Sequence, residues 1–557
     1  MTSLNTTSAT EQEPMSTPEP GTTLLLGGRI HSPAAPDATA MAVTDGVVVW
    51  VGQDSVGRAL YPQADRVVHL DGALVTPAFV DAHVHATSAG LLLDGLDLTG
   101  CASLAECLQA VRAHVAARPG TVVWGHGWDE TRWPEGRPPT RAELDQAAGG
   151  AAVYLSRIDV HSALVSSALL ERAPRARDAE GWSPEGPLSR QAHHEVRRAA
   201  QQALSPAQRR AAQEAFLRHA ASRGVVCVHE CAGPDISSPD DLADLLARAA
   251  VGDVPEVVGY WGQPGAEAVD LARELGVRGL AGDLFVDGAL GSRTAALREP
   301  YQDAPHTCGA LYLDADAIAE HLVACTRVGL QAGFHVIGDA AVAEVVEGFT
   351  RAEAVVGASA LAAARHRLEH LEMVQAVQAE QLARWGVVAS VQPLFDATWG
   401  GPDGMYAQRL GVERGTRLNP FSLLAARGVL LALGSDTPVT PLEPWAAVQA
   451  AVYHRTDGFG ISPRAAFTAH TRGGWRAAGV DDGLTGTLVP GAVAHYAVWE
   501  AGELVVAAPD ARVQRWSTDP RSRVPGLPSL EPGGELPRCL RTVRAGRVIY
   551  EREGALG

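Results

Sequence analysis

The chain has 557 residues and a formal net charge of −18, and 46% of its residues are apolar and 5% aromatic. This length is sufficient for a large barrel or for two to three domains, and the composition is typical of a globular enzyme. Nucleic acids and anionic membrane surfaces both attract basic proteins. The excess of acidic residues therefore argues against either of them as a partner.

The seven cysteines are an odd number, and no pair of them has Cys-x-x-Cys spacing. Reduced thiols in a cytoplasm fit this pattern better than a set of disulfides. Residues 1–21 are rich in Thr, Ser, Pro and Glu and lack the basic and apolar regions of a signal peptide, so we expect a disordered tail. Since no apolar run reaches about 18 residues, no membrane span is predicted.

Short strands are predicted at both ends of the chain. They occupy 23–30, 40–52 and 66–70 near the start and 494–499, 502–507 and 541–552 near the end. Neither group is large enough to bury a core alone. We therefore expect residues 22–75 and 484–557 to pair into one small β-sandwich domain.

Between these ends, apolar strand-like runs alternate with amphipathic helical stretches such as 241–250 and 314–328. This pattern is typical of βα units around a parallel sheet. Eight strands predict a (β/α)₈ barrel over 76–483, an α/β fold whose chemistry lies at the C-terminal ends of the strands. The eight candidate strands are 77–84, 225–229, 255–260, 283–287, 331–336, 366–371, 387–393 and 429–434.

Residues 90–220 are too long and too varied for a single βα unit. They contain extra strand-like runs at 121–126 and 152–158, a turn-rich segment at 128–139 and a helical stretch from 191 to 222. A loop of this length is improbable without structure of its own. We predict an insertion subdomain after the first barrel strand, which covers the mouth of the barrel as a substrate lid.

Two histidines, His83 and His85, end the first predicted barrel strand. Side chains alternate along a strand, so this i, i+2 spacing puts both imidazoles on one face. Two converging imidazoles make half of a metal site. Asp81 shares this face, and its carboxylate could hold the other N–H of a histidine and fix its tautomer.

Three later strands also end in a side chain that can bind metal. His335 ends the fifth strand, His370 the sixth and Asp436 the eighth, and a barrel directs all three to one axis. Each histidine alone has an ordinary explanation as a hydrogen-bonded core residue, but their joint occurrence favours a metal centre. Four histidines and an aspartate suit Zn²⁺ or a similar divalent metal, with an open position for water.

These residues, together with several longer motifs, resemble the amidohydrolase superfamily of metal-dependent hydrolases. The resemblance is to amidohydrolase family 3, in the branch of N-substituted formamide deformylase, and it covers nearly the whole chain. It implies a barrel with a β-sandwich built from both termini, as the predicted elements also indicate. The matching segments are 76–85, 127–129, 132–140, 285–295, 335–339, 369–370, 434–438 and 486–491.

The chain departs from the family at the fourth barrel strand. Members with two metals commonly use a carboxylated lysine there, and the matching residue here is Asp283, in a chain without lysine. Either Asp283 supplies a carboxylate to a second metal, or the site holds a single metal, which is the favoured alternative. The candidate ligands of a single metal are His83, His85, His335 and Asp436. His370 is then a ligand or a group that polarises the substrate carbonyl.

The catalytic candidates follow from the metal, which lowers the pKa of its bound water from about 15.7 toward about 7. Asp436 is the candidate general base, since a carboxylate beside the metal stays ionised, and His370 is the second catalytic candidate. Arg293 is a candidate for binding substrate or stabilising the oxyanion, with a salt-bridged structural arginine as the alternative. Trp128 and Trp399 could form an apolar substrate pocket, although tryptophans often only pack.

The expected function is hydrolysis of a C–N bond other than a peptide bond in a small-molecule substrate, by resemblance an N-substituted formamide or another small amide. A deaminase or a cyclic-amide hydrolase is the alternative within enzymes. A barrel that binds a small ligand without turnover is a third possibility, which the absence of lysine keeps open. A cytoplasmic location and a homodimer are further expectations.

Overall fold

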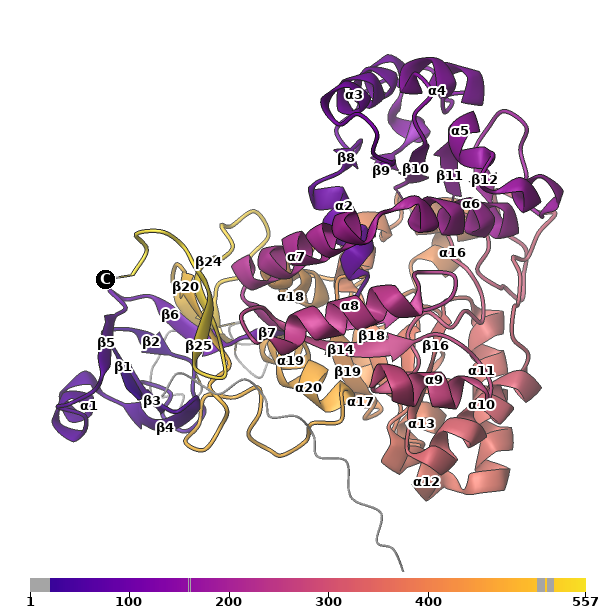
Figure 1. The fold of residues 1–557 in the computed structure, drawn as a ribbon. Helices are drawn as coiled ribbons and strands as arrows, with labels where there is room; N and C mark the ends of the chain where they lie inside the picture. The colour runs from indigo at the N-terminus through magenta and orange to yellow at the C-terminus, as the bar shows by residue number, and fades with distance from the viewer. Residues whose placement is uncertain (1–20, 159, 161, 508–515, 518–524, 557) are drawn as a thin grey trace, which may run out of the picture.

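The computed structural model describes residues 21–158, 160, 162–507, 516–517 and 525–556, so the tail expected at 1–21 lies almost entirely outside the described residues. A parallel sheet of eight strands forms the centre of the molecule (Figure 1). Its strands, in spatial order, are β7 (Phe79–Val84), β13 (Val225–Ala232), β14 (Glu256–Trp261), β15 (Gly279–Leu280), β16 (Gln331–Val336), β17 (Arg367–His370), β18 (Val388–Val391) and β19 (Leu430–Leu433).

The two outermost strands of this sheet, β7 and β19, approach each other where their C-terminal ends continue into loops. The backbone N–H of Asp436 donates to the carbonyl of His83 at 2.8 Å, and that of His85 donates to Thr437 at 3.0 Å. Gly434 permits this approach, because a Cβ there would lie 2.6 Å from the backbone nitrogen of His83. The sheet is therefore a nearly closed barrel, as the count of eight strands predicts.

The fourth barrel strand differs from the sequence prediction. The prediction places it at 283–287, whereas β15 covers only Gly279–Leu280 and Asp283 follows in a loop. The chain turns at Gly282, whose φ of 84° lies in the left-handed region that glycine adopts readily. Phe285 then makes only an isolated bridge to His335. The apolar run after Gly282 therefore resembles a strand in sequence without extending the sheet.

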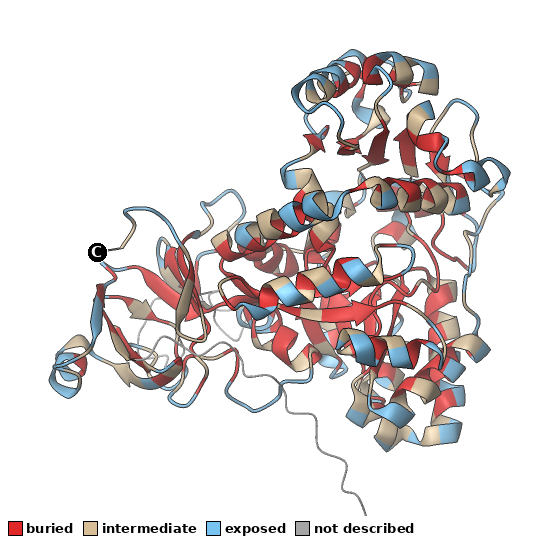
Figure 2. Cartoon of the chain, in the orientation of Figure 1, coloured by how far each residue is buried: buried red, intermediate tan, exposed pale blue. Residues whose placement is uncertain are grey.

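Helices pack on the outside of the barrel through their apolar faces. Figure 2 shows buried residues on the sides of these helices that face the strands and exposed residues on the outer sides. The helices include α8 (Pro239–Ala250), α9 (Ala268–Leu275), α10 (Ala315–Val328), α11 (Asp339–Val356), α13 (Ala376–Arg384) and α18 (Pro444–Val452). No described helix combines the length and the apolar character that a membrane crossing requires.

Both ends of the chain contribute strands to one sheet beside the barrel. In this sheet β6 (Leu74–Pro77) pairs with β20 (Tyr496–Glu500), and β2 (Arg29–Ile30), β24 (Arg538–Arg544) and β25 (Arg547–Glu551) complete it. A neighbouring sheet contains only N-terminal strands, β4 (Val47–Gly52), β3 (Ala40–Thr44), β1 (Thr22–Leu26) and β5 (Arg66–His69). Leu25, Val43, Tyr496 and Val543 belong to one buried cluster, so the two chain ends share a core.

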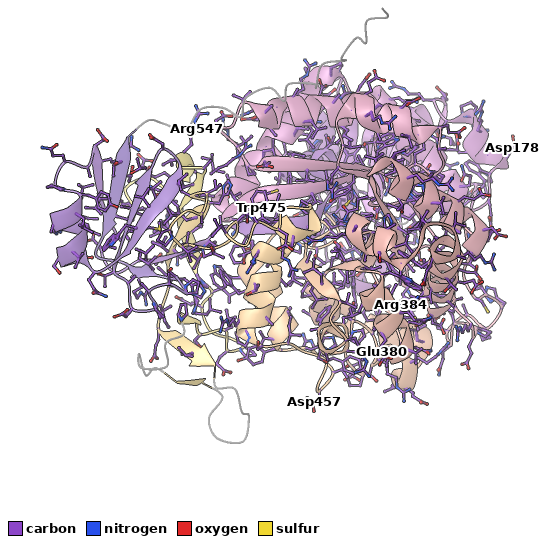
Figure 3. All side chains as sticks on the ribbon, turned by 90° about the horizontal axis from the view of Figure 1, so that it is seen from below. Asp178, Glu380, Arg384, Asp457, Trp475 and Arg547 are labelled. Carbon is purple, nitrogen blue, oxygen red and sulfur yellow. The ribbon has the colours of Figure 1, made fainter. Side chains whose placement is uncertain are left out.

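The residues between β7 and β13 form a separate layer with a sheet of its own. Its strands are β8 (Leu96–Asp97), β9 (Val123–Trp128), β10 (Val153–Arg157), β11 (Ser162–Val165) and β12 (Leu188–Ser189). Helix α6 (Arg190–Ala203) lies between this sheet and the barrel (Figure 1). In Figure 3, Asp178 of this insertion and Arg547 of β25 lie on opposite sides of the barrel. The insertion and the terminal sheets therefore attach to different sides of it.

Candidate metal centre

Six polar side chains converge at the C-terminal end of the barrel. Nε2 of His85 lies 3.2 Å from Oδ2 of Asp283 and 3.1 Å from Oδ1 of Asp436. Nδ1 of His335 and Nε2 of His370 lie 3.4 and 3.8 Å from Oδ1 of Asp283. The sixth side chain is His83, whose Nε2 lies 3.5 Å from Asp283 and 3.4 Å from Asp436. The fold thus brings together all the residues that the sequence marks as candidate ligands.

Several atoms that face this point have no hydrogen-bond partner in the described part of the chain. They are Nε2 of His83, Oδ1 of Asp283, Nδ1 of His335 and Oδ1 of Asp436, all buried. A buried polar atom without a partner costs about 1–3 kcal/mol, and most such atoms in folded proteins are satisfied. A bound cation would satisfy all four, and imidazole nitrogens with carboxylate oxygens are the donors that zinc and similar metals prefer. The residues present therefore fit a divalent metal.

In two of the ligand histidines, the ring nitrogen that points away from the centre is held by an acceptor. Nδ1 of His370 donates to Oε1 of Gln392 at 2.8 Å, and Nε2 of His335 donates to the carbonyl of Gly288 at 3.2 Å. Each acceptor keeps the proton on its own side of the ring, so the lone pair of the other nitrogen faces the centre. These rings are therefore set in the orientation and tautomer that metal binding requires.

Glu369 holds the outer ring nitrogen of His83 in the same way, and the sequence prediction does not include Glu369. Its carboxylate accepts from Nδ1 of His83 at 2.9 Å and from the guanidinium of Arg367 at 2.5 and 2.9 Å. Although burial raises the pKa of Glu369, the charge of Arg367 and the contact with His83 bring it well below its ordinary value. Asp81, the expected partner, instead accepts from the backbone N–H groups of His83 and Ser435.

The two carboxylates give the centre a negative potential. Burial raises the pKa of Asp283 and Asp436, but the neighbouring His83 and the other imidazoles lower both values below the ordinary range. Burial lowers the pKa of His85, whereas its close contacts with these carboxylates raise it to about 9. The surroundings therefore favour positive charge at this point, as a cation site requires.

Two of the candidate ligands lie on left-handed backbone. His370 has a φ of 69° and Asp436 a φ of 54°, both at the ends of their strands. Residues other than glycine adopt this region at a cost, and such residues often occur at functional sites. At His370 the change of direction ends the strand alternation, and its side chain reaches the same space as that of His335.

Two cavities open from the centre. The first has a volume of about 690 Å³ and is lined by Trp124, Tyr154 and one face of α6 from the insertion, with Asp283 and His335 from the barrel. The second has a volume of about 280 Å³ and includes Phe395, Trp399, Met405 and Tyr406. Both cavities are lined by His335, His370, Asp436 and Val439. A substrate with its reacting bond at the centre therefore has space on two sides.

Of the predicted substrate-binding residues, only Trp399 lines a cavity at the centre. Trp128 is 1% exposed and packs in the core of the insertion, where its indole N–H donates to the carbonyl of Leu155 at 2.8 Å. Arg293 pairs with Asp303 at 2.7 Å and lines neither cavity. Packing and an ion pair, the alternatives that the sequence left open, are what the structure places at these two residues.

Known proteins resemble the chain over most of its length. A protein called LONG AFTER FAR-RED 3 from Arabidopsis thaliana is 28% identical over 517 residues, which are 85% of this chain and 86% of that protein. N-substituted formamide deformylase from Arthrobacter pascens is 25% identical over 459 residues, with coverages of 78% and 83%. The solved structure of an uncharacterized metal-dependent hydrolase from Pyrococcus furiosus has a TM-score of 0.69 and 27% identity, and covers 86% of this chain and 98% of its own.

A family model described as "Amidohydrolase family" matches residues 66–550, which include the whole barrel and the flanking strands from β5 to nearly the end of β25. All six convergent side chains fall within this match. The protein therefore belongs to the amidohydrolase family.

Proposed function

We propose that the protein is a metal-dependent hydrolase that cleaves a C–N bond other than a peptide bond in a small molecule. The observation that carries this proposal is the convergence of four imidazoles and two carboxylates. Four of the atoms that face the centre have no hydrogen-bond partner among the described residues. Membership of the amidohydrolase family supports a hydrolase. The relative at 25% identity that acts as an N-substituted formamide deformylase makes a formamide the first substrate to test.

Zinc suits this donor set, which contains imidazole and carboxylate groups only. Asp283 belongs to two groups of ligand atoms, one with His83 and His85 and one with His335 and His370, each within 4.8 Å. We propose that Asp283 supplies the carboxylate that carboxylated lysine provides in two-metal members of the family. This arrangement supports a second metal more than the single ion expected from the sequence.

When bound, the metal supplies a Lewis acid and a water molecule of lowered pKa. Asp436 lines both cavities, so its carboxylate can reach a substrate from either side. Asp436 accepts a proton on the carboxylate oxygen that does not bind the metal and passes it to the leaving nitrogen, as general base and then acid. His370, held at Nδ1 by Gln392, presents Nε2 to the same space, where the neutral ring binds metal and the ring protonated at both nitrogens polarises the carbonyl.

Metal analysis and substrate turnover on one preparation test the proposal. The protein is purified without chelator, its metal content is measured by mass spectrometry, and formanilide, a cyclic amide, an aminopyrimidine and a dipeptide are offered as substrates. We expect at least one zinc per chain and release of aniline from formanilide. Release of ammonia from the aminopyrimidine would instead favour the deaminase alternative. Absence of both metal and turnover would contradict the proposal and favour a ligand-binding barrel.

A further inference from the structure

Helix α6 presents one polar face to the first cavity. Arg190, His193, His194 and Arg197 follow the spacing i, i+3, i+4 and i+7, and all four line this cavity. The opposite face packs into the insertion through Ala192, Val196, Ala199 and Ala200. Because α6 lies between the insertion and the barrel (Figure 1), its polar face forms the insertion side of the cavity.

The two arginines of this face differ in their partners. Arg190 forms an ion pair with Glu180. Arg197 has no carboxylate partner within the described ranges, and donates instead to the backbone carbonyls of Val160 at 3.0 Å and Asp235 at 3.4 Å. The side chain of Tyr154 also contacts this guanidinium. A guanidinium has five N–H donors, so these partners leave donors available to a ligand. Arg197 is therefore the uncompensated cation on this wall.

The acidic side chains that line the insertion side of this cavity are already paired, Glu180 with Arg190 and Asp235 with Arg198. The carboxylate of Asp235 lines the cavity but lies 3.3 Å from the guanidinium of Arg198, which also pairs with Glu195 at 2.8 Å. Arg198 follows Arg197 directly on the helix and does not line the first cavity. The charge of Arg197 thus faces the cavity while that of its neighbour is neutralised.

His194 adds a second unsatisfied group beside Arg197. Its Nδ1 is buried and has no hydrogen-bond partner among the described residues. Burial and the nearby Arg197 lower the pKa of His194 to about 4, so the ring is neutral at pH 7. The ring lies 6.3 Å from that of Phe285, which in turn lies 4.8 Å from His335. One aromatic side chain therefore separates this pair from the metal centre.

We propose that Arg197 and His194 form a carboxylate-binding subsite, and that the substrate is an amide with a carboxylate on one side of the scissile bond. The other, apolar side occupies the second cavity, whose aromatic wall includes Phe395, Trp399 and Tyr406. An arginine fork matches both oxygens of a carboxylate, which favours this anion over a neutral group. The inference rests on the proposed function, because it places the reacting bond at the metal centre.

Two amides that differ only in charge test the subsite, 4-(benzoylamino)butanoate and 4-(benzoylamino)butanamide. We expect kcat/KM of the zinc-loaded enzyme to favour the anion by about 10- to 100-fold, the range of a charge-assisted contact. Arg197→Gln should bring this ratio close to one, and Arg197→Lys should retain part of it, because lysine keeps the charge without the fork. The matched control Arg198→Gln should keep the ratio of the parent enzyme.

A binding measurement separates failure of the subsite from failure of the proposed function. 4-Phenylbutanoate has no scissile bond and is titrated calorimetrically into the zinc-loaded enzyme and its variants. We expect Arg197→Gln to weaken binding by about 10- to 100-fold. If neither amide is hydrolysed but this loss occurs, the subsite stands and the proposed function fails for these amides. If the parent and Arg197→Gln bind 4-phenylbutanoate equally well, the inference is overturned. Direct binding of the carboxylate to the metal would give this result. If Arg197→Gln does not fold, the same binding comparison is made with Arg197→Lys and His194→Gln.

Discussion

Oε2 of Glu369 lies 2.9 Å from Nδ1 of His83, and the same carboxylate binds the guanidinium of Arg367. All three side chains are fully buried. The guanidinium of Arg367 also stacks on Tyr260, with its Cζ 4.3 Å from the centre of the ring. A buried ion pair thus holds an imidazole whose other nitrogen faces the metal centre. Orientation of the ligand and stability of the barrel depend on one carboxylate.

Glu369→Gln separates these two roles when it is combined with a change of its partner. The single variant leaves a buried arginine unpaired, which should lower the free energy of unfolding by about 3–5 kcal/mol. It should also weaken metal binding by about 10- to 100-fold, because His83 loses an ionised acceptor. In the double variant Arg367→Met with Glu369→Gln, stability should recover in part while metal affinity stays low. Chemical denaturation and metal titration measure the two effects, and recovery of both together would show that Glu369 does not position His83.

Asp436→Asn should leave the metal largely bound and reduce hydrolysis by about 10²- to 10⁴-fold, because an amide cannot accept the proton. Metal content and kcat on the same preparation provide the measurement. If the variant kept a near-full rate, Asp436 would not be the general base. If it lost the metal and the activity together, Asp436 would act chiefly as a ligand.

Gly434→Ala tests the closure of the barrel beside His83. The added Cβ would lie 2.6 Å from the backbone nitrogen of His83 and 3.0 Å from Oδ1 of Asp81, neither of which can move freely. We expect a loss of about 1–3 kcal/mol in the free energy of unfolding, together with reduced metal content. Gly100→Ala is the matched control, since nothing lies within 4 Å of its Cβ position. Equal stability of the two variants would contradict tight closure at Gly434.

His366 should make the protein less stable as pH falls. Its Nδ1 accepts from the backbone N–H of Ala332 at 2.9 Å, and burial lowers its pKa to about 3. The unfolded chain, with a histidine pKa of about 6.5, binds this proton first, so the contribution of His366 is complete above that pH and is lost below it.

A buried histidine whose pKa is lowered in this way makes the free energy of unfolding fall by about 1.4 kcal/mol for each pH unit between about pH 6 and 4. His366→Gln should reduce the slope of unfolding free energy against pH by that amount, as measured by urea denaturation at pH 6.0, 5.0 and 4.5. Parallel slopes for the parent and the variant would mean that His366 is already protonated in the folded protein.

The parts of the site that depend on local periodicity could be predicted from sequence. Alternation in β7 places His83 and His85 together, and apolar strands identify His335 as a strand end. The approach of His370 depends on its left-handed backbone, and that of Asp283 on the turn at Gly282, neither of which a pattern of apolar residues reveals. His370 is nevertheless a sequence candidate because it ends an apolar strand, and Asp283 because it matches the family's lysine position.

Other contacts depend on how distant elements pack. In β17, Arg367 and Glu369 alternate with Leu368, a signal that two polar side chains face the barrel interior. The contact of Glu369 with His83 depends on how β17 and β7 are placed around the barrel. The stripe of Arg190, His194 and Arg197 on α6 is visible in the sequence, but the cavity that it faces arises only when the insertion packs over the barrel. The expected homodimer and cytoplasmic location stay predictions.

The carboxylate of Asp283 lies between 3.2 and 3.8 Å from four imidazoles, at the position where two-metal relatives commonly carry a modified lysine. That modification is a carbamate, which forms from dissolved carbon dioxide and is reversible. An aspartate brings its acid group within the polypeptide itself. If Asp283 takes the place of that lysine as proposed, assembly of the metal centre would be independent of bicarbonate supply.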